Sequence, residues 1–170
     1  MGAVSPYTII RSISLFHLTA AWFFLANPRK IVDQNAVFML GESMRLPHIT
    51  TMDKSSEASA FIAVLLAFFG LSDLTAASLD DLPALEYWLA NVPVRLAVLF
   101  AITAYSYLFK EDGMLGETQG AGRFLCNSFV FSWGFMELMI WFWIFVSLKE
   151  ERRVVAQKII DARKAEEDTL

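Results

Sequence analysis

The chain has 170 residues, of which 56% are hydrophobic and 19% charged, with a formal net charge of −4 and a single cysteine, Cys126. A net acidic chain lacks the basic surface that binds nucleic acid, so no nucleic acid partner is expected, and one cysteine excludes a disulfide within these residues. Soluble domains are about a quarter charged, so this excess of clustered apolar residues predicts an integral membrane protein, with the lipid bilayer as its first partner.

Four apolar segments are long enough to cross a bilayer, which takes roughly 20 residues of helix. The predicted spans cover residues 7–26, 58–77, 92–109 and 124–148. We therefore predict an all-α fold with a four-helix transmembrane domain, residues 1–148, and a charged C-terminal tail, residues 149–170. The first segment is interpreted as a retained span rather than a signal peptide, because residues 1–6 contain no basic side chain.

A connector of mixed character follows the first span. Pro28 ends the helix, and Arg29 with Lys30 mark a water interface. The next stretch, IVDQNAVFMLGESMRLPHIT, has apolar residues near helical spacing, but its apolar part is too short to cross a bilayer. We predict a short interfacial or re-entrant helix there, ending at Pro47.

The two remaining connectors differ in character. The stretch SLDDLPALEYWLA between the second and third spans is short and acidic, and Tyr87 with Trp88 are interpreted as aromatic-belt residues. Pro93 is expected in the first turn of the third span, where its missing N–H costs little. The stretch KEDGMLGETQGAGR has four glycines that match no phosphate-binding motif, so it is predicted to be a flexible connector.

The fourth span is rich in aromatic residues and leads into a charged tail. We interpret Trp133, Trp141 and Trp143 as lipid-facing or belt residues. The tail KEERRVVAQKIIDARKAEEDTL carries a weak apolar stripe, which predicts a solvated helix that lies along the membrane or contacts a protein partner. Lysine and arginine are equally numerous on the two sides, but their concentration beside the fourth span favours cytosolic termini.

Four ionisable side chains, His17, Asp73, Arg95 and Glu137, fall inside predicted spans, where such residues usually face the bundle interior. The short connector predicts that the second and third spans are antiparallel neighbours, so Asp73 and Arg95 share a depth. Each lies at the disfavoured end of its own helix dipole. We predict a structural ion pair between them, with snorkelling of Arg95 to head groups as the alternative.

His17 and Glu137 lie near the middle of their spans. Glu137 is expected either to be protonated and hydrogen-bonded or to pair with His17 at equal depth. Arg95 is offset by about 9 Å along the helix, so it would reach Glu137 only with tilted helices or an extended side chain. Two roles are open for this pair, polar contacts that hold helices together and a proton or cation pathway, and we favour the first.

No constellation of catalytic residues is visible in the sequence. His17 and His48 lie in different surroundings and lack metal-ligand spacing. No serine, histidine and aspartate set can be assigned, and no motif for a cofactor occurs. The sequence therefore predicts a protein that is not an enzyme and has no cofactor or metal site.

Three stretches, MRLPHITT, AFFGLSDL and NVPVRLAVLFAITAYSYLF, resemble in order and spacing the fungal increased loss of mitochondrial DNA protein family. Glu137 before an aromatic run, followed by KEERR, is also similar to that family. The resemblance covers residues 14–153, and the glycine-rich connector looks longer than the family usually has. It implies a small multi-pass protein of the fungal endoplasmic reticulum membrane with a role in maintaining mitochondrial DNA, no known catalytic activity and no catalytic residues to transfer.

Two functions are consistent with these observations. The first is a non-enzymatic membrane protein that supports mitochondrial DNA indirectly, through protein partners or through lipid or ion homeostasis. The alternative is a cation channel or transporter that uses the intramembrane polar residues. Four spans are few for a monomeric pore, so the alternative requires a homo-oligomer.

Overall fold

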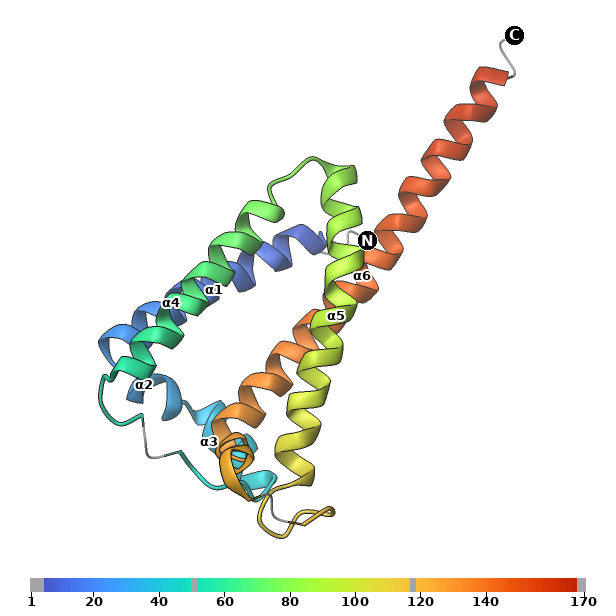
Figure 1. Cartoon of the computed structure of the whole chain (residues 1–170). Helices are drawn as coiled ribbons and strands as arrows, with labels where there is room; N and C mark the ends of the chain where they lie inside the picture. The colour runs from blue at the N-terminus through green and yellow to red at the C-terminus, as the bar shows by residue number, and fades with distance from the viewer. Residues whose placement is uncertain (1–4, 50–51, 117–118, 168–170) are drawn as a thin grey trace.

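The computed structural model describes residues 5–49, 52–116 and 119–167, and all the regular structure in these ranges is helical (Figure 1). The elements in chain order are α1 (Pro6–Ala26), α2 (Arg29–Val32), α3 (Asn35–Ser43), α4 (Glu57–Ala76), α5 (Asp81–Leu108), the 3-10 helix η1 (Gly120–Leu125) and α6 (Ser128–Glu167). In the described residues, α1, α4, α5 and α6 are long and apolar enough to cross a membrane. The predicted all-α class with four spans is thereby confirmed.

The four long helices form two pairs, α1 with α4 and α5 with α6 (Figure 1). The pairs approach each other beside the start of α1 and separate toward α2, and α3 packs against α6 at that open end. The expectation that the second and third spans pack along each other is wrong, because α4 lies against α1 and α5 against α6. The short connector instead brings the last turns of α4 near the middle of α5, where Asp73 meets Arg95.

Helix boundaries follow local capping. Ser56 and Ser59 form a capping box at the start of α4, with the Ser59 amide donating to Ser56 Oγ at 3.1 Å. The third span begins earlier than predicted, at Asp81, so Pro93 lies inside α5 rather than in its first turn. The fourth begins later, at Ser128, because the Val130 amide donates to Asn127 Oδ1 at 2.9 Å and Asn127 acts as the N-cap.

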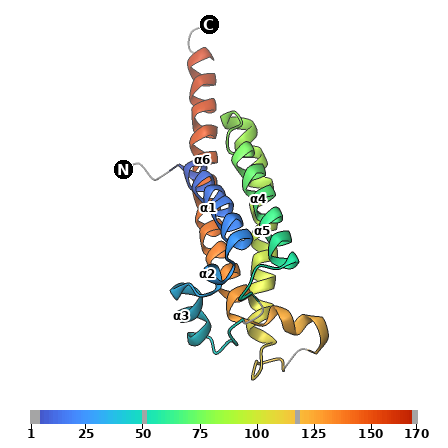
Figure 2. The same ribbon diagram turned by 90° about the vertical axis from the view of Figure 1, so that its left-hand side faces the viewer.

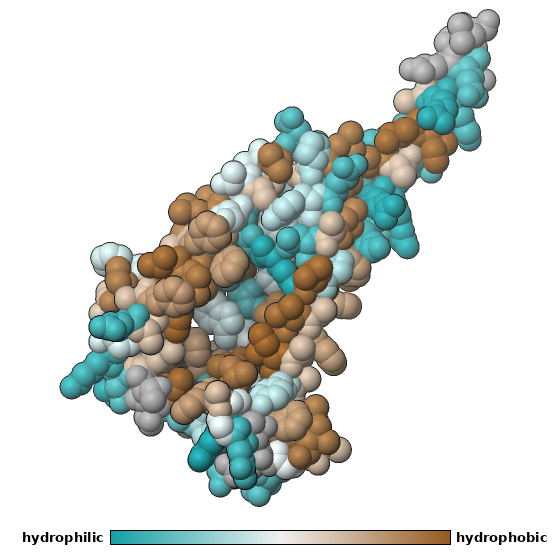
Figure 3. Space-filling view, in the orientation of Figure 1, coloured by the Kyte–Doolittle hydropathy of each residue, from teal (hydrophilic) through white to brown (hydrophobic). Residues whose placement is uncertain are grey.

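The charged tail is a direct extension of the fourth span. Helix α6 has 40 residues and shows no break near residue 148, so residues 149–167 continue the span as a helix. Figure 2 shows this part of α6 extending beyond the other helices. In Figure 3 hydrophilic surface dominates that projecting end, whereas hydrophobic surface covers much of α4.

The connectors contain more helix than the sequence suggested. The short helix predicted after the first span is present as α3, which buries Val37 and Gly41 and leaves Phe38 and Met39 exposed. This division into a packed and an exposed apolar side suits a helix at a membrane interface. The described part of the glycine-rich connector includes η1, which is preceded by Gly116 with a positive φ of 84°.

Two apolar clusters hold the bundle. The first lies where all four long helices meet and is centred on Trp88 and Trp141. The second, at the other end of α1, joins Phe24 to Phe129 at the start of α6 and to Val37 of α3. Lipid is as apolar as these side chains, so close packing and polar contacts, rather than apolar burial alone, must select the helix neighbours.

A candidate functional site inside the helical bundle

Asp73 of α4 and Arg95 of α5 form a two-pronged ion pair. Arg95 Nη1 and Nη2 donate to Asp73 Oδ2 and Oδ1 at 2.6 and 2.5 Å. Arg95 Nε also donates to Asn91 Oδ1, one turn earlier on α5, at 2.6 Å. The Asp73 side chain is fully buried and that of Arg95 is 25% exposed. This geometry satisfies both charges in a site where either charge alone would be costly.

Two indole rings complete the surroundings of Arg95. Its guanidinium carbon lies 4.5 Å from the ring centroid of Trp141 and 5.4 Å from that of Trp88. The two rings stack on each other with centroids 5.6 Å apart. Both are buried, with exposures of 0% for Trp88 and 2% for Trp141. The interpretation of these two tryptophans as belt or lipid-facing residues is therefore wrong, because each ring faces a cation inside the bundle.

Glu137 of α6 connects the tryptophan pair to α1. Trp141 Nε1 donates to Glu137 Oε2 at 2.8 Å, and His17 Nε2 lies within hydrogen-bond distance of Glu137 Oε1, also at 2.8 Å. The side chains of His17 and Glu137 are 8% and 7% exposed. The His17 ring stacks at 6.0 Å on Trp133, whose ring Phe16 also contacts. Trp133 therefore packs against α1.

The contacts form one continuous polar network across four helices. It runs from Asp73 of α4 to Arg95 of α5, continues through Trp141 and Glu137 of α6, and ends at His17 of α1. The structure thus brings together Asp73 with Arg95 and His17 with Glu137. Trp141 joins the two pairs, because its ring lies against the Arg95 guanidinium and its N–H donates to Glu137, although Arg95 and Glu137 lie at different depths along their helices.

Trp141 and Asn91 are the site residues that the sequence reasoning missed. Glu137 and Trp141 are four residues apart on one helix, as are Asn91 and Arg95, and that spacing places each pair on one helix face. This signal was available in the sequence. The stacking of Trp88 on Trp141 had no local signal, because it depends on how α5 packs against α6.

Three buried polar atoms have no hydrogen-bond partner among the described residues, and one of them belongs to the network. They are His17 Nδ1, Trp88 Nε1 and Thr103 Oγ1. Where the chain is described, no group of three or more histidine, cysteine, aspartate or glutamate side chains is placed to hold a metal ion. The contacts that the structure shows in this network are paired charges and hydrogen bonds between helices.

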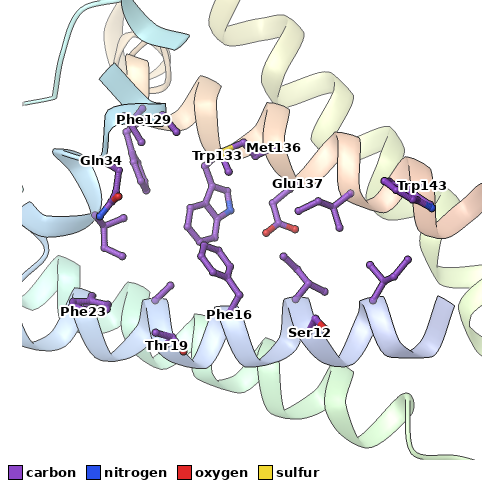
Figure 4. Close-up of a pocket in the computed structure, with 17 residues that line it drawn as sticks. Ser12, Phe16, Thr19, Phe23, Gln34, Phe129, Trp133, Met136, Glu137 and Trp143 are labelled. Atoms are coloured by element: carbon purple, nitrogen blue, oxygen red, sulfur yellow. The ribbon is translucent and has the colours of Figure 1, made fainter. Parts of the chain in front are cut away.

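A cavity of about 760 Å³ lies between α1 and α6, beside this network (Figure 4). Glu137, Trp133 and Phe16 point into the space between the two helices in the close-up, with Gln34 at one end. The remaining wall is largely aliphatic and aromatic. Glu137 is the network residue that lines this apolar cavity, which has the size of a small-molecule site, about 300–1,000 Å³.

Known sequences resemble this chain over most of its length. The sequence profile of the family described as "Increased loss of mitochondrial DNA protein 1" matches residues 4–158, a range that contains the whole polar network. Protein ilm1 of Schizosaccharomyces pombe is 30% identical over 166 residues, covering 92% of this chain and 89% of that protein.

Protein ILM1 of Saccharomyces cerevisiae is 30% identical over 141 residues, which cover 81% of this chain. The match includes 61% of that protein, so the chain spans about three fifths of this relative's length. No solved structure matches the chain.

Proposed function

Because this chain belongs to the increased loss of mitochondrial DNA protein 1 family, we propose that it is a non-enzymatic, multi-pass protein of the endoplasmic reticulum membrane that supports maintenance of mitochondrial DNA. The family match over residues 4–158 carries this proposal. The role is indirect and is exerted through protein partners or through lipid or ion homeostasis. The four long apolar helices support the membrane assignment.

Within this function, the polar network acts as a structural lock. It connects α4 to α5 through Asp73 and Arg95, and α6 to α1 through Glu137 and His17. Helices in lipid are held by such polar contacts and by close packing. The link between Arg95 and Glu137 passes through the Trp141 ring, whose face has no group that takes up and releases a proton, and this supports the lock over a proton pathway.

The projecting end of α6 is the proposed contact for protein partners. Residues 149–167 are mostly exposed, and Val154, Ile159 and Ile160 are exposed apolar side chains among charged neighbours. Gln157 Nε2 donates to Asp161 Oδ1 at 2.8 Å along the same helix. A preformed helix loses little conformational entropy when it binds a partner, which suits a recruitment role.

Complementation tests this proposal in fungal cells that lack their own family member. The full chain should restore retention of mitochondrial DNA, measured as the fraction of respiring colonies and as copy number. A chain ending at residue 148 should insert into the membrane at the normal level yet fail to restore retention. Full rescue by the shortened chain would contradict the recruitment role of α6.

A second candidate is a homo-oligomeric cation channel, favoured by the buried His17–Glu137 pair, of which Glu137 lines the cavity. Purified chain in liposomes would then conduct K⁺, and Glu137→Gln would change the flux because it removes an intramembrane charge. Asp33→Asn, which removes a charge outside the spans, is the control. Liposomes that contain correctly inserted, folded protein and pass no cation would exclude this candidate.

A further inference from the structure

The cavity between α1 and α6 offers an occupant almost nothing but apolar contacts. Three of its polar side chains already donate to backbone carbonyls: Ser12 Oγ to Thr8 and Thr19 Oγ1 to Leu15, both at 2.9 Å, and Gln34 Nε2 to Lys30 at 2.8 Å. Both Glu137 oxygens face partners in the network. A polar solute would therefore leave its own groups without partners here, whereas a hydrocarbon chain would not.

The cavity continues into a basic mouth. A second pocket of about 420 Å³ shares Phe23, Ile31 and Gln34 with the first and is also lined by Arg29 and Lys30. These two cations follow directly after α1 ends at Ala26, at the level expected for lipid phosphates. The apolar cavity is thus placed to hold the hydrocarbon tail of a membrane lipid, and the basic mouth is placed to hold its head group.

The charges at the mouth favour a negative head group. Arg29 Nε donates to Asp33 Oδ2 at 2.9 Å, and this hydrogen bond holds the pKa of the Asp33 carboxyl below its usual value. Asp33 therefore stays ionised and neutralises one of the two cations. Among the residues that line this pocket, Arg29 and Lys30 face a single carboxylate, Asp33, so the lining keeps a net positive charge that attracts anionic lipid, with Asp53 acting on Arg29 from outside it.

We propose that this continuous space binds one anionic glycerophospholipid, with an acyl chain between α1 and α6 and its phosphate at Lys30 and Arg29. Phe16 and Trp133 form the aromatic wall along the chain. A sterol would fill the apolar part but has no charged group for the mouth, and a free phosphate would not occupy the apolar part. The site does not depend on a role in mitochondrial DNA maintenance.

Native mass spectrometry of the full chain in detergent tests the site. The probe is an equimolar mixture of phosphatidylserine, phosphatidylcholine and cholesterol, and the measurement is the fraction of protein that retains each lipid. We expect one retained phosphatidylserine, and the double variant Arg29→Gln with Lys30→Gln should weaken it by about tenfold or more, since each basic group contributes about 1 kcal/mol. The control double variant, Arg45→Gln with Lys54→Gln, removes the same charge outside both pockets and should retain the lipid.

The apolar part has its own variants. Thr19 lines the cavity and Thr8 does not, and both are exposed on α1, so Thr19→Trp should abolish retention whereas Thr8→Trp should not. Ala36→Trp fills the same space from α3 and provides a second test in case Thr19→Trp misfolds, with helicity measured by circular dichroism.

Equal retention of phosphatidylserine and phosphatidylcholine, or preferential retention of cholesterol, would overturn the proposal. So would unchanged binding by the Arg29/Lys30 double variant, whatever the outcome of complementation.

Discussion

The Asp73–Arg95 pair is strong only as a pair, because the Asp73 carboxylate is fully buried against the guanidinium. Replacing one member by an apolar residue leaves the other charge unpaired inside the bundle. Replacing both leaves two apolar side chains in apolar surroundings and no unpaired charge. The indole ring of Trp141 then links this pair to Glu137. At the scale of single residues, the structure is therefore sensitive to which partner is deleted.

We expect Arg95→Leu to destabilise the protein by about 3–5 kcal/mol, because it leaves Asp73 charged, buried and without a partner. The double variant with Asp73→Leu and Arg95→Leu should recover most of that loss. The measurement is unfolding of detergent-purified protein in increasing dodecyl sulfate, followed by circular dichroism. Equal losses in the single and double variants would instead indicate that Arg95 acts by snorkelling to head groups.

Trp141→Phe isolates the hydrogen bond to Glu137, since phenylalanine keeps an aromatic face for Arg95 but has no N–H. Loss of this donor from a buried carboxyl group should cost about 1–3 kcal/mol. Trp22→Phe, an equally sized change at a side chain that is 66% exposed, should stay within about 0.5 kcal/mol. Similar unfolding of the two variants would show that the Trp141 N–H contributes nothing.

The ion pair could be predicted from the sequence, but the tryptophan pair could not. Asp73 and Arg95 are separated by a short connector, which leaves each as the other's nearest partner. The dipole argument holds only for Asp73 near the end of α4, because α5 begins at Asp81 and places Arg95 in mid-helix. Trp88 and Trp141 occur near span ends, where exposed aromatic residues are common. Only the packing of α5 on α6 places both rings over Arg95.

Small residues decide which helices pair. A Cβ added to Gly70 of α4 would lie 2.9 Å from the carbonyl oxygen of Ser14 on α1. On the other pair, a Cβ at Gly134 of α6 would lie 2.6 Å from Thr103 Oγ1 of α5. Both glycines therefore permit close approach of the kind that holds helices together in lipid. The atoms that an added Cβ would meet differ. At Gly70 the atom is a backbone oxygen, whereas at Gly134 it belongs to a side chain that can rotate.

Gly70→Val should separate α4 from α1 and destabilise the protein by about 1–3 kcal/mol, since the Ser14 backbone cannot move aside. Gly134→Ala should cost less, because the Thr103 hydroxyl can turn away. Ser72→Val adds similar bulk on the exposed side of α4 and is the matched control. Thermal unfolding in detergent would rank the three, and a Gly70→Val protein as stable as the control would contradict this account of the α1–α4 contact.

The positions of the spans were predictable from hydropathy, but their pairing was not. The α1 and α4 helices agree with the predicted spans within one residue at each end. Their faces are apolar on several sides, and lipid competes equally with a neighbouring helix for such faces. Pairing instead depends on contacts such as that of Gly70 with Ser14, which no hydropathy pattern reveals.

At the scale of the whole molecule, four spans place the start of α1 and the projecting part of α6 at the same end of the bundle (Figure 1). The basic residues concentrated beside the end of the fourth span favour the cytosol for that end. In the orientation that we propose, residues 29–49 and 52–56 and the described part of the glycine-rich connector lie on the lumenal side. This topology also places the basic mouth of the proposed lipid site at the lumenal head groups.

Trypsin treatment of sealed endoplasmic reticulum microsomes checks this topology. The exposed Arg152, Arg153 and Lys158 of α6 should be cut, and an epitope tag at either terminus should be lost. The N-terminal tag must itself contain lysine, because the first basic residue of the chain, Arg11, lies inside α1. A tag placed between Asp53 and Lys54 should survive in sealed microsomes and be lost once detergent opens them. Survival of the terminal tags together with loss of the connector tag would invert the orientation, and loss of only one terminal tag would contradict an even number of spans.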